Sequence, residues 1–208
     1  MSCENIIFFG MLKNYYKANV FEAGCDEVGR GCLAGPVVAA AVILGEKNTI
    51  KGLNDSKKLS LKTRLALAKE IKQKAISYAV AEVSNEDVDK INVLNASFLA
   101  MHRALEKLSQ QPEFILVDGN RFKPYKNIEY ECVIKGDGKY ASIAAASILA
   151  KTYRDQLMID LAKEYPGYYW ENNVGYPTKA HRQAIKELGV TRLHRKSFQL
   201  LPRQIELF

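Results

Sequence analysis

Acidic residues stand at the ends of three predicted apolar strands. Asp26 and Glu27 lie inside an apolar segment, and Asp118 and Asp137 each follow a short strand-like run. Sites in open α/β sheets form outside the carboxyl ends of strands, so neighbouring strands would bring these four carboxylates together. Two like charges about 4 Å apart repel by about 4 kcal/mol at an effective dielectric of about 20. Such a cluster requires either protonation or bound cations.

The type of ligand indicates the type of ion. Carboxylate oxygens are hard ligands, which suit Mg²⁺ or Mn²⁺ better than Zn²⁺. Two such ions held by shared carboxylates suit phosphodiester hydrolysis, because one activates water and the other stabilises the leaving oxygen. The sequence offers no convincing Ser-His-Asp or Cys-His set, and we expect His181 and His194 to be hydrogen-bonded structural residues. We therefore predict a two-metal site that needs no protein nucleophile.

Turn formation is the competing explanation for a single acid. The pairs Asp118-Gly119 and Asp137-Gly138 are turn dipeptides, and a turn accounts for either of them taken alone. Asp26 and Glu27 differ, because burying two adjacent acids costs on the order of several kcal/mol without compensation. Two acids in that position call for a functional explanation.

A further acid, Asp155, competes with Asp137 for the fourth place in the cluster. Asp155 lies on the polar stripe of a predicted helix, where Lys151 and Arg154 could neutralise it. We favour Asp137, because it ends a strand beside Asp118 and sites gather at strand ends.

Predicted strands and helices alternate along the chain. Unbroken apolar runs indicate strands covered on both faces, and apolar residues three and four positions apart indicate helices. We expect two strands joined by a glycine-rich turn within 23–44, further strands at 78–83, 114–117 and 128–134, and helices at 94–108, 139–164 and 178–188. Another helix should begin after an N-cap at Ser60 and bury the face formed by Leu61, Leu65, Ala68, Ile71 and Ala75. The alternation indicates an α/β layered domain.

The composition favours a polyanionic partner. Thirty Lys and Arg against 23 Asp and Glu give a net charge of +7, which a nucleic-acid-binding protein uses for affinity and steering. The four cysteines, Cys3, Cys25, Cys32 and Cys132, form no C-x-x-C pair and no zinc spacing. No apolar stretch approaches the roughly 20 residues that span a bilayer. We expect a cytoplasmic protein that does not contact membranes.

Several segments, in this order, resemble the motifs of ribonuclease HII. They lie at 24–36, which contains Asp26-Glu27-Val28-Gly29-Arg30-Gly31, and at 54–59, 117–120, 135–137, 144–151, 154–155, 175–178 and 194–198. The likeness spans roughly residues 20–200. It implies a ribonuclease H-like α/β fold, with a mixed sheet of about five strands flanked by helices and a small helical C-terminal part.

The resemblance also implies roles for individual residues. Asp26, Glu27, Asp118 and Asp137 match the metal-binding carboxylates of the family. Residues 29–31, Gly29-Arg30-Gly31, match the loop whose backbone senses the ribose 2′-hydroxyl, the group that separates RNA from DNA. Tyr176 matches the tyrosine that packs on the deoxyribose beside the scissile junction. The expected phosphate contacts are Lys57, Lys58, Lys151 and Arg195.

The family implies an activity and a division of the chain. The expected reaction is hydrolysis of RNA in RNA–DNA hybrids, and of single ribonucleotides in duplex DNA, on the 5′ side of the ribonucleotide. It would leave 3′-hydroxyl and 5′-phosphate ends. We expect an N-terminal extension at 1–19, a catalytic domain at 20–165, and a C-terminal substrate-binding part at 166–203. Nothing in the sequence demands more than a monomer.

Two positions depart from the family pattern. Val28 stands where ribonuclease HII usually has Ala, and Cys32 stands where Pro is usual. The sequence Asp-Glu-Val-Gly is closer to ribonuclease HIII, whereas Arg30 and the long helical segment at 139–164 fit type II. The sequence does not determine how these two departures affect the packing of the loop beside the acids.

The last five residues form a candidate docking peptide. Residues 204–208, Gln204-Ile205-Glu206-Leu207-Phe208, resemble the peptide with which bacterial replication and repair proteins bind the sliding clamp. A glutamine can orient hydrogen bonds, while Ile205, Leu207 and Phe208 can fill an apolar pocket. The alternative is a chain end that folds back on the core.

Two other functions deserve comparison. A hybrid-binding protein without activity would explain the charge but not the acids at strand ends. A different metal nuclease on the same fold, such as a Holliday-junction resolvase, would explain the acids. The segment Gly29-Arg30-Gly31 argues against it, since selection for a 2′-hydroxyl is the purpose of that loop in the family that the chain resembles.

Overall fold

A mixed five-stranded sheet forms the centre of the molecule. The computed structural model describes residues 12–45 and 50–201, and within them the strand order is β3-β2-β1-β4-β5. The strands are β1 (Glu22–Val28), β2 (Val37–Ile43), β3 (Ser77–Val83), β4 (Phe114–Asp118) and β5 (Glu129–Val133). β2 pairs antiparallel with β1 and β3, whereas β1, β4 and β5 run parallel. The expected α/β fold is confirmed, and the carboxyl ends of β1, β4 and β5 share one edge.

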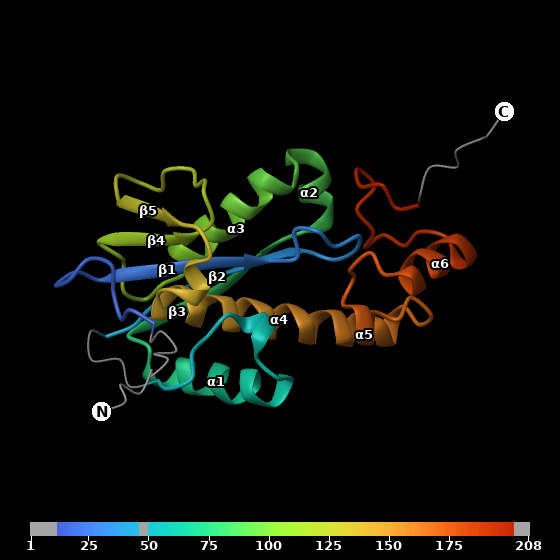
Figure 1. Ribbon diagram of the computed structural model, residues 1–208. Coiled ribbons are helices and arrows are strands. Elements are labelled where there is room, and N and C mark those ends of the chain that lie inside the picture. Colours follow the sequence, from blue (N-terminus) through green and yellow to red (C-terminus); the bar gives the residue numbers. More distant parts are fainter. Residues whose placement is uncertain (1–11, 46–49, 202–208) are drawn as a thin grey trace, which may run out of the picture.

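Helices cover both faces of the sheet (Figure 1). In Figure 1 α2 and α3 lie above the sheet, and α1 and α4 lie below it. The helices are α1 (Leu61–Lys74), α2 (Asn85–Ile91), α3 (Val93–Glu106), α4 (Ala141–Glu164), α5 (Trp170–Asn173) and α6 (Lys179–Leu188), with short 3-10 helices at Ser56–Lys58 and Gly136–Gly138. Every residue of β2 is buried, as expected for a strand covered on both faces. None of the described helices is both long and apolar enough to cross a membrane.

Helix α4 lies directly against β1. A Cβ atom added to Gly24 would come within 2.2 Å of the carbonyl carbon of Ser142, so only glycine fits between the strand and the helix. Three consecutive small residues of α4, Ala144, Ala145 and Ala146, are also fully buried. Small residues on both elements therefore let the backbones approach, and this contact fixes the position of the strand that carries Asp26.

The C-terminal part packs against the loop between β1 and β2. Leu33 and Ala34 of that loop form an apolar cluster with Met158, Trp170 and Ile185. Ala34 also forms an isolated antiparallel bridge with His194. At the other end of the chain, Lys13 bridges Tyr140 at the start of α4. The predicted tail at 204–208 and most of the predicted extension at 1–19 lie outside the described residues.

The buried face of α1 differs from the predicted one. Arg64, Leu67, Ala68 and Ile71 are buried, whereas Leu61 and Leu65 are 56% and 48% exposed. The periodicity identified the helix, but the buried stripe of α1 is rotated about the helix axis relative to the predicted stripe. The reason is that Arg64 turns inward to pair with Asp155 of α4. The short helices α2 and α5 were not predicted, since neither is long enough to show a helical repeat.

Candidate active site at the strand ends

The two adjacent acids of β1 point to opposite faces of the sheet. Asp26 pairs in register with Ala40, which belongs to the core beneath α1 and α4, and Glu27 pairs with Ala39, which belongs to the core beneath α3. Side chains alternate along a strand, so the neighbours face opposite ways. Asp26 is 7% exposed, and its Oδ1 accepts a hydrogen bond from the Glu27 backbone N–H at 2.7 Å.

Asp118 connects the ends of β4 and β5. Its Oδ1 accepts a hydrogen bond from the Gly136 N–H at 2.7 Å, which ties the loop after β5 to the end of β4. Leu116, two residues earlier on the same face, packs with Ile143 of α4, so Asp118 faces the same side as Asp26. Asp137 follows Gly136 in the 3-10 helix and is also buried.

Electrostatic interactions join the four carboxylates. Burial, followed by the charges of Glu27 and Asp118, raises the pKa of Asp26 well above its usual range. Burial also raises the pKa of Glu27, although Arg30 opposes the shift, and Asp118 adds to it. The pKa of Asp137 is raised by burial first and then by Asp118. Carboxylates this close together require protonation or bound cations, and the raised pKa values reflect that requirement.

The donor set suits a hard divalent cation, although the carboxylates are engaged with protein donors. Asp118 and Asp26 accept backbone hydrogen bonds, and Glu27 pairs with Arg30 at 3.1 Å. Accordingly, residues 12–45 and 50–201 contain no group of three or more His, Cys, Asp and Glu side chains already arranged to hold a metal ion. All the available ligands are oxygens that repel one another, which fits Mg²⁺ or Mn²⁺ and not Zn²⁺. Binding an ion would require these oxygens to exchange protein donors for the ion.

Asp155 already has two cationic partners. Its carboxylate pairs with Arg64 at 2.9 Å and with Lys151 at 2.7 Å, and it is buried. Lys151 and Arg154 were the two residues expected to neutralise Asp155. Lys151 does so, whereas Arg64 takes the place of Arg154. Asp155 is therefore an ion-pair partner inside the fold, which favours Asp137 as the fourth carboxylate.

The two glycines of the glycine-rich loop differ in the space available for a side chain. Gly29 has a φ of +95°, and a Cβ there would lie 2.4 Å from Arg154 Nε. Gly31 has no atom within 4 Å of the position of such a Cβ and is exposed. Gly29 is therefore required by the fold itself, whereas the space beside Gly31 is free for a substrate.

Two buried arginines hold the loop between β1 and β2 through hydrogen bonds to its backbone. Arg154 donates to the carbonyl oxygens of Ala34, Pro36 and Val174 at 2.7 to 3.0 Å. Arg195 donates to Gly35 O twice and to Arg30 O at 3.0 Å. Both side chains are fully buried. The placement of Arg195 contradicts the expected phosphate contact, because its donors are directed into the protein.

The other predicted contact residues lie nearer the surface. Lys57 and Lys58 are exposed in the 3-10 helix that Asp55 caps. Lys151 is held by Asp155, and its ammonium lies 5.7 Å from the centre of the half-buried Tyr176 ring. The structure therefore brings Lys151 and Tyr176 together.

Sequence reasoning missed several supporting side chains. Ser56 and Ser147 are buried and hydrogen-bonded to each other at 2.9 Å, and Ser147 hydrogen-bonds the carboxylate of Asp26. Asp55 lies near Asp137 and adds to the rise of its pKa. The signal was present, since Asp55, Ser56 and Ser147 all stand in segments that resemble the family motifs, but their contacts depend on tertiary structure.

A buried histidine pair supports the backbone of Tyr176. His181 Nδ1–H donates to Tyr176 O at 2.9 Å, and Trp170 Nε1–H donates to His181 Nε2 at 2.9 Å. His194 Nε2 lies 3.2 Å from His181 Nε2, and His194 Nδ1 accepts from the Thr191 N–H at 2.9 Å. These partners require both histidines to be neutral. The expectation that they are hydrogen-bonded structural residues is confirmed.

The two departures from the family pattern occupy ordinary apolar positions. Val28 packs at the edge of the core beneath α1 and α4. Cys32 is buried, and its thiol lies 3.9 Å from Val174 O. Neither side chain blocks the space beside Gly31.

Comparisons with known proteins agree on one family. The family model described as Ribonuclease HII matches residues 23–201. Ribonuclease HII of Parabacteroides distasonis is 60% identical over 197 residues, covering 95% of this chain and 99% of the relative. Ribonuclease HII of Christiangramia forsetii is 60% identical over 194 residues, covering 93% and 98%.

Solved structures show the same fold. The ribonuclease H2 of Pyrococcus horikoshii has a TM-score of 0.72 at 27% identity, covering 86% of this chain and 94% of that one. The PCNA–RNase HII complex of Archaeoglobus fulgidus also gives 0.72 at 27% identity, covering 90% of this chain and 100% of that one. With the acids at the strand ends and the glycine loop in place, the chain belongs to the ribonuclease HII family of metal-dependent endoribonucleases.

Proposed function

We propose that the chain hydrolyses the RNA strand of RNA–DNA hybrids and also cuts duplex DNA at single embedded ribonucleotides. The cut falls on the 5′ side of the ribonucleotide and leaves 3′-hydroxyl and 5′-phosphate ends. The electrostatic influence of Asp118 on each of Asp26, Glu27 and Asp137 is the observation that supports this most strongly. The cellular task that fits is removal of ribonucleotides and RNA primers from DNA.

The four carboxylates are the proposed ligands of two divalent cations, Mg²⁺ or Mn²⁺. Bound there, the ions supply an activated water and stabilise the charge of the leaving oxygen. The protein positions the ligands: α4 fixes β1 through Gly24, and the loop after β5 fixes Asp118 through the Gly136 N–H. Asp155 stays with Arg64 and Lys151 and takes no part in binding the ions.

Selection for RNA is proposed to occur at the loop of Gly29, Arg30 and Gly31. Open space beside Gly31 lets a ribose approach the backbone, and Arg195 fixes the loop by donating to Arg30 O. Tyr176 packs on the deoxyribose next to the cut, and the C-terminal part at 166–203 closes the groove over the duplex. Lys57 and Lys58 bind phosphates without reading sequence. Lys151 contributes to substrate binding from its position over the Tyr176 ring.

The test uses a labelled DNA duplex that contains one ribonucleotide, with an RNA–DNA hybrid and an all-DNA duplex as companions. Wild type is compared with Asp118→Asn in Mg²⁺ and in Mn²⁺. A matched control is Asp160→Asn, which removes an exposed acid paired with Lys163. We expect the wild type and the control to cut both ribonucleotide-containing duplexes and Asp118→Asn to cut neither.

Each other outcome has a definite meaning. Cutting of long hybrids alone would remove the single-ribonucleotide part of the proposal. Tight hybrid binding without cutting in either ion would support an inactive binding protein. Equal cutting by wild type and Asp118→Asn would place the reaction elsewhere.

A second proposal concerns the tail Gln204-Ile205-Glu206-Leu207-Phe208, which we expect to bind the sliding clamp. The Archaeoglobus fulgidus structure is that of a PCNA–RNase HII complex, which supports an interaction of this kind. Deleting residues 204–208 should abolish retention on immobilised bacterial clamp while leaving hybrid cleavage intact. Retention that survives the deletion would rule the tail out.

A further inference from the structure

A continuous groove leads away from the candidate active site on the α3 side of the sheet. Its inner section is a pocket of about 240 Å³ that includes Glu27, Arg30 and Asp118. Its outer section, of about 500 Å³, reaches Tyr130 on β5. Both sections share four lining residues, Leu94, Phe98, Asn120 and Arg121. The α3 groove, as we call it, therefore begins among the acids and extends beyond them.

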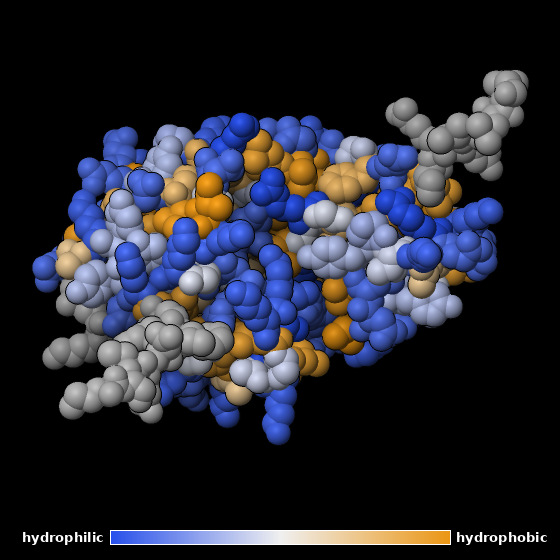
Figure 2. Space-filling model, viewed as in Figure 1, coloured by the Kyte–Doolittle hydropathy of each residue, from blue (hydrophilic) through white to orange (hydrophobic). Residues whose placement is uncertain are grey.

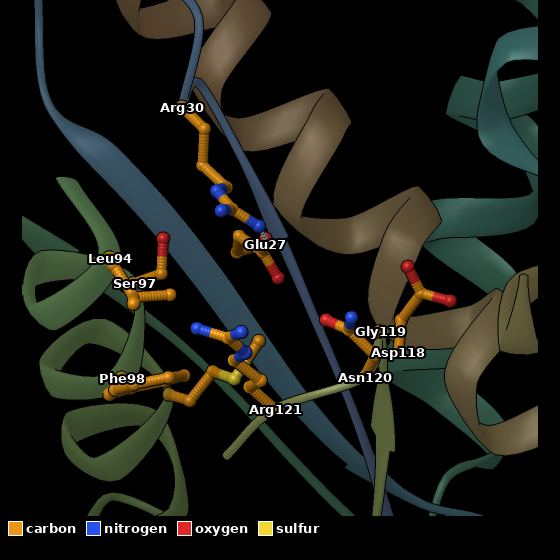
Figure 3. A pocket seen from close by; sticks show the side chains of 10 residues that line it. Glu27, Arg30, Leu94, Ser97, Phe98, Asp118, Gly119, Asn120 and Arg121 are labelled. Atoms are coloured by element: carbon orange, nitrogen blue, oxygen red, sulfur yellow. Dashed lines mark hydrogen bonds and ion pairs between the residues drawn. The ribbon is translucent and has the colours of Figure 1, made fainter. Parts of the chain in front are cut away.

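The two walls of the α3 groove differ in character. Leu94 and Phe98 of α3 form an apolar wall, and Asn120 and Arg121, which follow β4, form a polar one (Figure 3). In Figure 3 the Arg121 side chain lies between α3 and the end of the sheet, while Arg30 extends toward Glu27. An apolar wall facing polar groups suits a nucleotide chain, which offers sugar faces and phosphates together.

The side chains of the polar wall are available to bind a ligand. Asn120 and Arg121 are exposed, and neither side chain forms a hydrogen bond or ion pair with another of the described residues. Arg30 differs, because it is engaged by Glu27 at 3.1 Å. Arg121 thus presents a guanidinium without an acid partner among the residues at 12–45 and 50–201, next to a cluster of carboxylates.

Charge and position identify the occupant. A guanidinium is suited to a phosphate, which it can grip through two N–H groups. The exposed acid Glu131 lines the outer section, so a phosphate is better placed at Arg121 than beyond it. Farther out, Phe122 and Tyr130 form an edge-on pair with ring centres 5.2 Å apart, which offers ring surface to a sugar or base.

The face containing α3 and the sheet end is mainly hydrophilic, with apolar patches between polar side chains (Figure 2). Such a surface suits a polyanion, because affinity comes from phosphate contacts and the apolar patches contact sugars and bases.

We propose that the α3 groove binds the nucleic-acid strand being cut, on one side of the scissile phosphate. Arg121 grips the backbone phosphate nearest the acids on that side, Asn120 hydrogen-bonds the adjoining sugar-phosphate, and Leu94 and Phe98 pack against the sugar. This inference rests on the proposed function for the identity of the substrate, and it adds a subsite that extends the contact beyond the reacting nucleotide.

The experiment measures KM and kcat for Arg121→Ala on duplexes that contain one ribonucleotide. The duplexes have full flanks, a shortened 5′ flank, or a shortened 3′ flank. With full flanks, we expect Arg121→Ala to raise KM by about tenfold, with a far smaller effect on kcat, and to reduce the salt dependence of binding by about one phosphate contact. Arg121→Lys should restore part of the affinity, since it keeps the charge but loses the paired N–H groups of the guanidinium.

The flank series identifies the side of the cut that fills the groove. Shortening that flank should raise the KM of the wild type to the level of Arg121→Ala, and the two proteins should then behave alike. The matched control is Lys69→Ala, which removes an exposed charge from α1 on the opposite side of the sheet. Its KM should equal that of the wild type on every duplex.

Failure of this inference can be distinguished from failure of the proposed function. Binding of an RNA–DNA hybrid to Asp118→Asn, with and without Arg121→Ala, is followed by fluorescence anisotropy and needs no cleavage. Weaker binding by the double variant would support the groove even if no substrate is cut. An unchanged KM with full flanks, together with equal binding by the single and double variants, would overturn it.

Discussion

The two glycines of the loop after β1 do different work. Gly29 has a positive φ and no room for a side chain, whereas Gly31 has open space around it. A family motif alone gives both residues one explanation, because both permit close approach of the backbone. The structure separates them: Gly29 serves the contact with Arg154, and Gly31 remains available to a ligand.

This difference predicts opposite outcomes for two substitutions. Gly29→Ala should destabilise the fold by about 2 kcal/mol or more, because it adds both strain and a clash. Gly31→Ala should change stability by less than about 0.5 kcal/mol, yet it should strongly reduce cleavage, since its Cβ would occupy the space proposed for the ribose. Urea unfolding and a cleavage assay measure the two effects. Full activity of Gly31→Ala would argue against a ribose at this position.

At the scale of the elements, the contact between β1 and α4 sets the position of the acids. Gly24 permits that contact and lies two residues before Asp26. Ser147 of the same helix hydrogen-bonds the Asp26 carboxylate. The contact with α4 thus fixes the backbone of β1 near Asp26, and Ser147 fixes the Asp26 side chain.

Gly24→Ala should therefore be severely destabilising, by about 3 kcal/mol or more, because its Cβ would overlap the backbone of Ser142. Gly45→Ala is the matched control, since the nearest atom to its Cβ would be 3.8 Å away. Thermal unfolding of both variants measures the effect. A Gly24→Ala protein as stable as Gly45→Ala would show that β1 and α4 are not held in this contact.

The histidine pair that connects α5, α6 and the C-terminal segment should make stability depend on pH. Burial, followed by the proximity of His181, lowers the pKa of His194 to about 4, and the pKa of His181 is lowered as well. A histidine with a depressed pKa stabilises the fold fully above its unfolded pKa of about 6.5, and this stabilisation is lost as the pH falls toward the folded value.

Between pH 6.5 and pH 4, His194 alone should cost the folded state about 3 kcal/mol. Urea unfolding across this range should show a shallower decline for His194→Asn, which cannot be protonated there. Raised carboxyl pKa values act in the opposite direction and are common to both proteins, so they cancel in the comparison. Parallel declines would contradict the neutral histidine pair.

The elements show what a sequence can and cannot predict. The strands, α3, α4 and α6 were recognisable because their apolar patterns are long and regular. The burial of Arg64 and Arg195 was not, since each depends on partners more than 90 residues away in the sequence. Net charge and motif position suggested that Arg195 contacts phosphate, but a buried guanidinium that donates to backbone carbonyls gives the same sequence pattern.

On the scale of the whole molecule, the sheet assembles a site from distant parts of the chain. The strand order places β1 between β2 and β4, and β5 follows β4, so acids up to 111 residues apart in the sequence meet at one edge. The sequence predicted which acids belong together. The opposite orientation of Asp26 and Glu27 follows from the alternation of side chains along any strand. The sequence could not predict that a groove continues from Glu27 along α3, because the groove depends on where that helix packs against the sheet.

The central claim is that these four carboxylates form one divalent-cation site. It is tested most directly by titrating Mn²⁺ into the full-length protein, following the free ion by electron paramagnetic resonance, for wild type, Asp118→Asn and Asp160→Asn. The account predicts saturable Mn²⁺ binding by the wild type and Asp160→Asn, and affinity lower by about 100-fold or more in Asp118→Asn, since loss of a ligand exceeds the cost of losing an outer hydrogen-bond partner. Equal binding by all three proteins would contradict it.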